Sequence, residues 1–362
     1  MAESILKKLG HALSALTAGK EGNLLGLSLG SSAIKAVELV KKGKQWKLSN
    51  FGMIQLPEDA IVDREIMNSV AVVESLKTLI SQAKIKNKSV CLSISGASLI
   101  IKRMQVEAAS EGELQDAVFW EAEQYISFDI SDCILDFHRI GKIADNKYDV
   151  LLVAVKRSMV EAYMNCVIQA GLVPKVVDVD YFALNNLYEA NYPKNPQGAT
   201  CLVDIGAAST KLAISFNGIT TFTKDVAMGG KALTTEIQKQ MGLSYEDAEM
   251  LKQGAADGGI PQQVSELMAI MAENLGDEIK RTIDFYAASS SESPVMEVLI
   301  SGGGSRINGL AQVIAEKTAL PTQMINPFQS VLFDEKKLSP DFIAQIAPLA
   351  AIPVGLAIRS GE

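Results

Sequence analysis

One short pattern occurs twice in this chain and limits what the chain can fold into. Residues 27–37 read LSLGSSAIKAV and residues 203–213 read VDIGAASTKLA, and the two align without a gap. Gly206 therefore follows its counterpart Gly30 by 176 positions (206 − 30). A pattern that occurs once in each half predicts a duplicated domain whose two copies face each other across a cleft.

Each copy of the pattern predicts a strand, a tight turn and a second strand. In the second copy an apolar run reaches Asp204, turns on Gly206 and continues through small or hydroxyl residues into another β-type run. A glycine-bearing tip without bulky side chains presents several backbone N–H groups at one point, which suits a phosphate. Since single turns of this kind occur in many unrelated proteins, the prediction of a phosphate site rests on the pair.

A third glycine cluster follows a buried strand near the end of the chain. Residues 298–310 read VLISGGGSRINGL, which predicts a strand that ends in Gly302, Gly303 and Gly304 and then a helix. Three glycines allow a flat ligand to lie against the backbone, and the start of a helix favours an anion. Two phosphate hairpins followed by a strand, glycines and a helix form a specific order of parts.

In this order of parts the chain resembles the actin, Hsp70 and sugar-kinase superfamily, and within it the PilM family of type IV pilus assembly proteins, relatives of FtsA. The resemblance extends over nearly all of the chain from Leu24 onward. The passages that carry it are LLGLSLGSSAIKAVEL, NFGMIQLPEDAIVD, FWEAEQYISFDI, VVDVDYFALNNLYE, TKDVAMGGKALTTEIQKQMGLSYEDAEMLK and INPFQSV. It implies an α/β, actin-like fold of duplicated ribonuclease-H-like lobes around a nucleotide cleft, with an FtsA-type inserted α+β subdomain.

The composition argues against several other classes of protein. With 362 residues, 48% apolar and 21% charged, the chain reads as a folded protein of two domains. The net charge of −8 argues against a nucleic-acid surface. Two histidines and four scattered cysteines argue against a zinc site, a His-based triad or a disulfide framework, so we expect buried thiols in a reducing cytoplasm. No secretory signal is visible, and the apolar residues 347–358 are too few to span a bilayer.

We expect five structural parts, two of which are each formed by two separate segments of the chain. Residues 1–22 form an amphipathic N-terminal tail, which is either a weak membrane or partner anchor or a segment that packs on the body of the protein. The first lobe takes residues 23–96 and 174–195, the inserted partner-binding subdomain takes 97–173, the second lobe takes 196–230 and 295–362, and its helical subdomain takes 231–294.

The insert is predicted to follow the order strand, helix, strand, strand, helix, as in a small ferredoxin-like layer with both helices on one face. Its first helix, residues 110–125, is acidic and ends in bulky aromatic residues. The resemblance implies that a groove of the insert receives the N-terminal peptide of PilN, and we expect that groove beside this helix. Core packing is the alternative for Phe119 and Trp120. The expected groove residues are Trp120, Glu121, Glu123, Tyr125 and Phe128.

The resemblance also implies roles around bound ATP or ADP and Mg²⁺. The expected nucleotide-binding residues are Gly30, Ser31, Ser32, Lys35, Asp204, Gly206, Ala208, Ser209, Thr210, Lys211, Gly229, Gly230, Lys231, Glu236, Gly302, Gly303, Gly304 and Ser305. Asp204 is expected to hold Mg²⁺ through water, and Lys35 is either a phosphate ligand or a surface lysine of a strand. Asp178 and Asp180 lie where the superfamily aligns the attacking water, although alternating aspartates also mark a solvated strand edge. Lys231 or Glu236 is expected near the ribose and base.

One position departs from the superfamily pattern. Ser28 stands where the first hairpin usually carries Asp, and the lost negative charge weakens the case for fast hydrolysis more than the case for nucleotide binding. Two classes of function stay open. One is an ATP-binding cytoplasmic scaffold of type IV pilus assembly and twitching motility, with slow or no hydrolysis. The other is an actin-like ATPase or small-molecule kinase that cycles at a useful rate.

The scaffold class has its own alternative and its own partners. It implies a location at the inner face of the inner membrane, peripheral to it, with the PilN peptide and other inner-membrane or motor proteins of the pilus as partners. An FtsA-like, membrane-linked divisome protein is the alternative. FtsA-like proteins end in a basic amphipathic helix after a linker, whereas this sequence stops just past its last expected core element.

Overall fold

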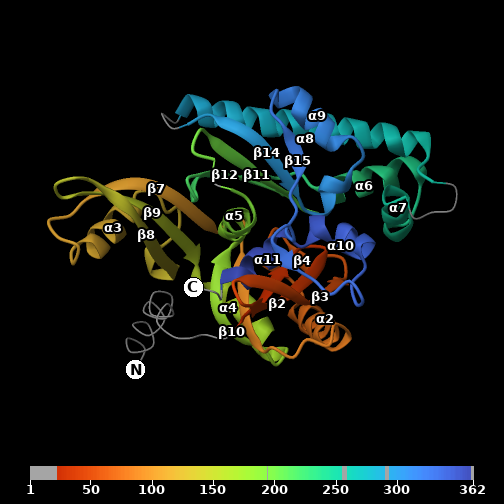
Figure 1. The fold of residues 1–362 in the computed structure, drawn as a ribbon, viewed down its shortest axis with the longest axis horizontal. Helices are drawn as coiled ribbons and strands as arrows, with labels where there is room; N and C mark the ends of the chain where they lie inside the picture. The colour runs from red at the N-terminus through yellow and green to blue at the C-terminus, as the bar shows by residue number, and fades with distance from the viewer. Residues whose placement is uncertain (1–22, 194, 255–258, 290–292, 360–362) are drawn as a thin grey trace.

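The chain forms two lobes that each contain a mixed sheet, and a small third sheet projects from one side (Figure 1). The computed structural model describes residues 23–193, 195–254, 259–289 and 293–359. Helices α5 (Asp180–Asn191) and α11 (Ala351–Ile358) lie between the two larger sheets. The expected N-terminal tail, residues 1–22, lies outside the described residues.

The first lobe is built on a six-stranded sheet with the strand order β10-β6-β1-β2-β3-β16. Its strands are β1 (Leu25–Leu29), β2 (Ala33–Lys42), β3 (Gln45–Gln55), β6 (Ser89–Ile94), β10 (Val173–Val179) and β16 (Val331–Leu332). Because side chains alternate between the faces of a strand, β1 directs Leu27 into a core with α2 (Ser69–Gln82) and α4 (Arg157–Gln169). On the opposite face Gly26 lets α11 approach closely, since a Cβ there would lie 2.0 Å from the Pro353 carbonyl oxygen.

The second lobe is built on a five-stranded sheet with the order β13-β12-β11-β14-β15. Its strands are β11 (Ala199–Ile205), β12 (Thr210–Phe216), β13 (Ile219–Val226), β14 (Val295–Ser301) and β15 (Thr322–Met324). Helices α6 (Gly230–Met241), α8 (Gln262–Ser289) and α9 (Leu310–Thr318) bury their apolar stripes against one face. The short helix α7 (Tyr245–Lys252) begins after its N-cap Ser244, whose Oγ accepts from the Asp247 N–H at 3.1 Å.

The two lobes repeat one another's strand pairing. Strand β1 pairs antiparallel with β2 and parallel with β6, and β11 pairs antiparallel with β12 and parallel with β14. The duplication predicted from the two hairpin sequences is therefore confirmed.

The insert consists of a three-stranded sheet with one helix on it. Strands β7 (Leu99–Glu107), β9 (Lys147–Lys156) and β8 (Cys133–Ala144) lie in that order, and α3 (Leu114–Ala122) packs on one face of the sheet. The second helix expected in this layer is α4, but its Met159, Tyr163 and Val167 are buried with α2 in the core of the first lobe. The amphipathic pattern of α4 predicts that one face of the helix is buried, but it does not say against which sheet. The prediction that two helices cover the inserted sheet was therefore wrong.

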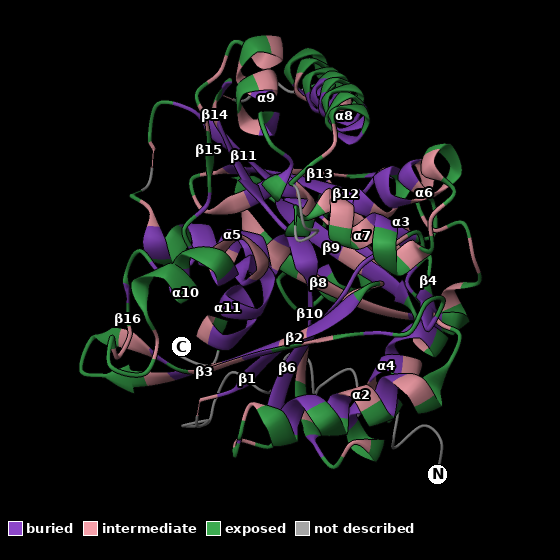
Figure 2. Ribbon diagram, turned by 90° about the vertical axis from the view of Figure 1, so that its right-hand side faces the viewer, coloured by how far each residue is buried: buried purple, intermediate pink, exposed green. Residues whose placement is uncertain are grey.

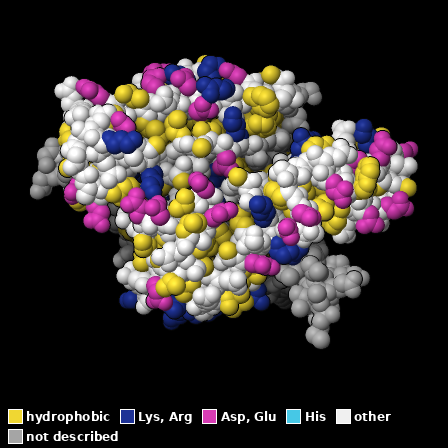
Figure 3. All heavy atoms as spheres, turned by 180° about the vertical axis from the view of Figure 1, so that it is seen from behind, with side chains coloured by type: hydrophobic (Ala, Val, Ile, Leu, Met, Phe, Trp, Pro, Cys, Tyr) yellow, Lys and Arg dark blue, Asp and Glu magenta, His cyan; other side chains and the backbone are white. Residues whose placement is uncertain are grey.

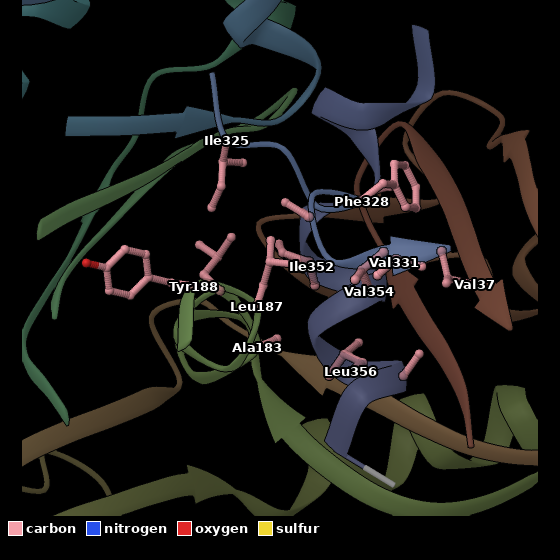
Figure 4. Packing of buried hydrophobic residues seen from close by; sticks show 14 of the residues in the cluster. Val37, Ala183, Leu187, Tyr188, Ile325, Phe328, Val331, Ile352, Val354 and Leu356 are labelled. Atoms are coloured by element: carbon pink, nitrogen blue, oxygen red, sulfur yellow. The ribbon is translucent and has the colours of Figure 1, made fainter. Parts of the chain in front are cut away.

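The core between the lobes is formed mainly by α5 and α11 (Figure 4). A Cβ on Gly355 would lie 1.9 Å from the Ala183 carbonyl oxygen, so glycine allows these two helices to cross in contact. Residues of both large sheets, among them Val37 and Leu299, belong to the same buried cluster. Figure 2 shows α5 and α11, both largely buried, between the sheets of the two lobes.

The C-terminal helix α11 consists entirely of apolar residues and glycine. Within the described ranges, no single helix has both the length and the apolar composition needed to cross a bilayer. Among the described residues, one pair of helices, Pro340–Leu349 and α11, meets those criteria when taken together, and the two parts are bent by 88°. Every residue of α11 except the last is buried. The four cysteines are free and buried, as expected.

Candidate functional site

The tips of the two hairpins have the same hydrogen-bonded turn and line one cavity. The Gly30 N–H donates to the Ala33 carbonyl at 3.0 Å, and the Gly206 N–H donates to the Ser209 carbonyl at 3.0 Å. Both glycines line the same cavity, so the prediction that the hairpins face each other is confirmed. Because the glycine N–H groups close their own turns, an anion would have to use those of residues 31–32 and 207–208.

In each hairpin a lysine on the second strand pairs with the residue of the first strand that lies two positions before the turn glycine. Lys211 lies opposite Asp204, and Lys35 lies opposite Ser28. Lys211 Nζ lies 3.5 Å from Asp204 Oδ2, so the second hairpin has a cross-strand ion pair where the first has an ammonium facing a hydroxyl. Burial lowers the pKa of Lys35, while the carboxylate of Asp204 across the cavity raises it in part. Lys35 is a cleft residue and not a surface lysine.

Asp180, the first residue of α5, brings a carboxylate from the first lobe to the same cavity. Lys211 Nζ lies 3.2 Å from Asp180 Oδ2, and the Ser93 hydroxyl donates to the other carboxylate oxygen. Burial alone raises the pKa of Asp180, but Lys211, Arg64 and hydrogen bonds from Ser93 and Ser95 hold that pKa below its ordinary value. The carboxylate is therefore charged at neutral pH.

Asp178 does not share this position. Its Oδ1 accepts from the Val179 N–H at 2.8 Å, and its Oδ2 lies 3.3 Å from Arg359 Nε after the end of α11. Burial raises the pKa of Asp178. Asp180 lines the cavity and Asp178 does not, so the structure brings only one of the two expected aspartates to the hairpins.

Arg64 is a cavity residue that sequence reasoning missed. It lies between the short strands β4 (Ile61–Val62) and β5 (Glu65–Ile66), and its guanidinium donates to Ser209 Oγ at 3.0 Å. No motif marks it, and the two residues lie 145 positions apart. The sequence shows here only a charged run, residues 63–65, between short apolar segments. Leu349, Ile352 and Pro353 are further unforeseen residues that line the cavity. Ser301 was also unforeseen, and its Oγ lies 3.1 Å from Asp204 Oδ1.

The glycines after β14 pack on the second hairpin. A Cβ on Gly302 would lie 2.3 Å from the Ile205 carbonyl oxygen, and one on Gly304 would lie 2.4 Å from Ile205 Cγ2. Contact with the hairpin therefore accounts for both glycines, and Gly303 is the exposed member of the three. Ser305 is buried, and its Oγ donates to the Gly302 carbonyl at 2.6 Å. Of the three glycines expected to lie against a flat ligand, Gly303 is the one that is exposed.

The start of α6 caps the second turn. The Gly230 N–H donates to the Gly206 carbonyl at 2.9 Å, and the Lys231 N–H donates to the Ala207 carbonyl at 2.8 Å. A Cβ on Gly229 would lie 2.5 Å from the Ala207 carbonyl oxygen, so Gly229 also serves this close approach. These helix N–H groups hold the hairpin in place.

The remaining residues of the second hairpin differ in exposure. Ala208 and Ser209 are half-buried at the tip, whereas Thr210 is fully buried. Thr210 Oγ1 donates to the Met228 carbonyl at 2.7 Å, so its hydroxyl fixes the loop before α6.

Lys231 and Glu236, expected near the ribose and base, have other contacts along α6. Lys231 Nζ lies 3.2 Å from Asp59 Oδ1 and 3.4 Å from Glu58 Oε1, so these ion pairs reach the first lobe. Glu236 Oε1 accepts from Gln240 Nε2 at 2.9 Å, one turn along the same helix.

The expected groove residues lie on α3 and in the loop after it. Trp120 is 67% exposed, whereas Phe119 packs with the core of the insert, so the core alternative holds only for Phe119. Lys102 Nζ lies 5.1 Å from the centre of the Tyr125 ring, and Lys156 Nζ lies 5.3 Å from that of Phe128. Glu121 and Glu123 lie on the same segment, and acidic side chains gather at the outer end of the insert in Figure 3.

A larger cavity, of about 330 Å³, lies where the insert meets the second sheet. The beginning of β7, Tyr181 of α5 and the end of β13 line it. Leu99 and Ile101 of β7 pack toward the core shared by the lobes, on the face of the inserted sheet away from α3. Strands β7 and β13 are both at the edges of their sheets, so each presents backbone N–H and carbonyl groups that a further strand can pair with.

Comparisons with known proteins agree with this architecture. The model of the family described as type IV pilus assembly protein PilM matches residues 26–361. A solved PilM–PilN type IV pilus biogenesis complex is 26% identical with a TM-score of 0.84, over 94% of this chain and 99% of that one. MreB5 of Spiroplasma citri bound to ADP is 13% identical with a TM-score of 0.54, over 94% and 96% of the two chains.

A curated relative matches more narrowly. The cell division protein FtsA of Neisseria meningitidis serogroup B is 25% identical over 128 residues, which are 35% of this chain and 28% of FtsA. The structural likenesses confirm the actin-like fold that the sequence motifs implied. Because the family model matches nearly the whole chain, the chain belongs to the PilM family of type IV pilus assembly proteins.

Proposed function

We propose that this protein binds ATP or ADP between the two hairpins and acts as a scaffold of type IV pilus assembly. The charge of the cavity carries the nucleotide part of the proposal. Lys35, Lys211 and Arg64 line it together with Asp180 and Asp204, so three cationic side chains meet two carboxylates. An anion supplies the missing negative charge. A polyphosphate suits the site because the cations come from both lobes and lie around both turns.

The site also fits a magnesium ion that arrives with the phosphates. The described residues hold no group of three His, Cys, Asp or Glu side chains that could bind a metal. Asp204 faces the cavity and would hold the ion through water, with phosphate oxygens as the remaining ligands. Bound Mg²⁺ would neutralise part of the phosphate charge.

Slow or absent hydrolysis is part of the proposal. Asp180 is the carboxylate placed to act on a water, but its pKa is lowered and it is ion-paired with Lys211, so it accepts a proton poorly. Ser28 supplies no carboxylate on the first hairpin. Phosphate release in a single turnover tests this point. A rate near that of ordinary kinases, roughly 1–100 s⁻¹, would contradict the scaffold and favour a cycling ATPase or kinase.

Capture of a PilN peptide is the partner function we propose, since the structural relative is a complex of PilM with PilN. The sequence favours the surface of α3 that carries Trp120. The structure offers a second surface in the cavity between β7 and β13, whose edge strands suit an extended peptide that pairs by its backbone. Either surface would place the protein at the inner face of the inner membrane, where other inner-membrane or motor proteins of the pilus could also bind.

A peptide titration separates these surfaces. The N-terminal peptide of PilN is titrated into the full chain with and without ATP, and the same is done with Trp120→Ala and Ile100→Glu. Weaker binding to Ile100→Glu alone would assign the cavity, and weaker binding to Trp120→Ala alone would assign the α3 surface. No binding by the unaltered chain, with or without ATP, would contradict peptide capture.

A further inference from the structure

Arg64 is held in a backbone conformation that is unfavourable for its residue type. Asp63 and Arg64 form the two-residue turn between β4 and β5, with φ values of +48° and +68°. Such turns ordinarily contain glycine or asparagine, because a Cβ is strained in the left-handed region. A strained residue that the surrounding structure holds in place is a reason to look for a function at that residue.

The first lobe fixes both the backbone and the stem of Arg64. The Tyr163 hydroxyl donates to the Arg64 carbonyl at 3.0 Å, and Tyr163 is itself buried in α4. Gly96 has a φ of +119°, and a Cβ there would lie 2.8 Å from Arg64 Cγ. Gly96 therefore leaves the space through which the side chain reaches the cavity.

The guanidinium of Arg64 crosses from the first lobe to the second hairpin. Its Nη2 donates to Ser209 Oγ at 3.0 Å and lies 4.0 Å from the position of a Cβ on Gly206. Arg64 is only 8% exposed. A guanidinium has five N–H donors in a fork that fits two oxygens of a phosphate. Its hydrogen-bond partner here is the neutral Ser209 hydroxyl, and the Asp180 carboxylate interacts with its charge. The group is placed and charged for an anion at the tip of the second hairpin.

We propose that Arg64 recognises the terminal phosphate of a bound nucleoside triphosphate and so distinguishes ATP from ADP. The inference rests on the proposed nucleotide binding. The exposed Gly303 belongs to the second lobe, whereas Arg64 comes from the first. Arg64 lines the cavity between the hairpins and contacts the tip of the second one, so a nucleotide with its base near Gly303 and its phosphates between the hairpins would present its last phosphate to Arg64. Binding replaces the bond to Ser209 with bonds to phosphate oxygens, and the terminal phosphate then joins the lobes through Arg64.

Calorimetric titration of the full chain with ATP and, separately, with ADP tests this role. In Arg64→Gln we expect the ratio of ATP to ADP affinity to fall by about tenfold or more, as for the loss of a charge-assisted hydrogen bond. The affinity for ADP should change by less than about threefold. Arg64→Lys keeps the charge but loses the fork, so an intermediate ratio is expected. Tyr163→Phe frees the Arg64 carbonyl and should lower the ratio without removing the guanidinium.

A matched control and the remaining outcomes complete the test. Arg281→Gln removes an arginine whose side chain is 66% exposed on α8, and it should leave the ratio unchanged. Thermal melting identifies any variant that fails to fold. If Arg64→Gln fails to fold, the affinity ratios of Arg64→Lys and Tyr163→Phe provide the test instead. If Arg64→Gln leaves the ratio of ATP to ADP affinity unchanged, whether or not both affinities fall, this inference alone is overturned. An unaltered chain that binds neither nucleotide would overturn this inference together with the proposed function.

Discussion

Lys211 Nζ on the second hairpin lies 3.2 Å from Asp180 Oδ2 on α5, so a buried ion pair joins the two lobes at the cavity. The same Nζ lies 3.5 Å from Asp204 Oδ2, and Lys211 is only 2% exposed. One ammonium therefore contacts two buried carboxylates. Because an uncompensated buried charge is costly, this arrangement fixes how closely the hairpin and α5 approach each other.

Removing this ammonium should destabilise the protein strongly. Lys211→Met removes the one cation that contacts both Asp180 and Asp204, and we expect a loss of about 3–5 kcal/mol in the free energy of unfolding. A clear fall in the melting temperature in calorimetry measures this loss. Lys77→Met removes a lysine from an exposed pair with Glu74 and serves as the control, with an unchanged melting temperature expected. An unchanged melting temperature in Lys211→Met would contradict the stabilising role of these contacts.

Nucleotide affinity should fall at alkaline pH because of Lys35. Burial holds the pKa of Lys35 below its ordinary value in the empty site, and Asp204, Lys211, Asp180 and Arg64 face it. A bound phosphate favours the protonated ammonium and raises that pKa, so affinity is highest below the pKa of the empty site and falls as the pH rises through it.

Titrations of ATP at a series of pH values from neutral to alkaline measure the effect. In Lys35→Met the affinity should be lower at neutral pH and should depend less on pH. A pH profile identical in the variant and the unaltered chain would exclude Lys35 as the titrating group.

Ser28 should make nucleotide binding less dependent on magnesium than a carboxylate at that position would. In Ser28→Asp the new carboxylate faces Lys35 across the strand pair, as Asp204 faces Lys211. It neutralises Lys35 and repels phosphate, so ATP affinity without Mg²⁺ should fall by about tenfold, and added Mg²⁺ should restore it. Parallel titrations in EDTA and in Mg²⁺ measure both values. Equal Mg²⁺ dependence in the two proteins would contradict this account of Ser28.

Gly302 and Gly303 should respond differently to the same substitution. Gly302 has a φ of +87°, and a Cβ there would lie 2.3 Å from the Ile205 carbonyl oxygen, so Gly302→Ala should lower the melting temperature. A Cβ on Gly303 meets Leu349 Cδ2 at 3.6 Å, an ordinary contact, so Gly303→Ala should fold normally. If Gly303 lies against the nucleotide, Gly303→Ala should bind ATP more weakly while its melting temperature stays unchanged. Gly302→Ala should not show this combination.

The hairpins were predictable from sequence because all of their determinants are local. The turn glycine, the lysine across the strand pair and the small tip residues lie within a few positions of one another, and the second copy supplied the evidence for a cleft. Arg64 was not predictable, because its contact with Ser209 spans 145 positions and depends on the packing of Tyr163 and Gly96. A cluster of glycines after a strand can be explained by a ligand that lies against the backbone or by a close tertiary contact. For Gly302 the tertiary contact with Ile205, and not a ligand, supplies the reason.

The most direct test of the account is a calorimetric titration of the full chain with ATP in the presence of Mg²⁺. We expect saturable binding of one nucleotide per chain. We also expect that Ala207→Asp, which adds a carboxylate at the tip of the second hairpin, weakens binding by at least about tenfold. A flat titration with the unaltered chain, or binding that Ala207→Asp leaves unchanged, would contradict a nucleotide held between the two hairpins.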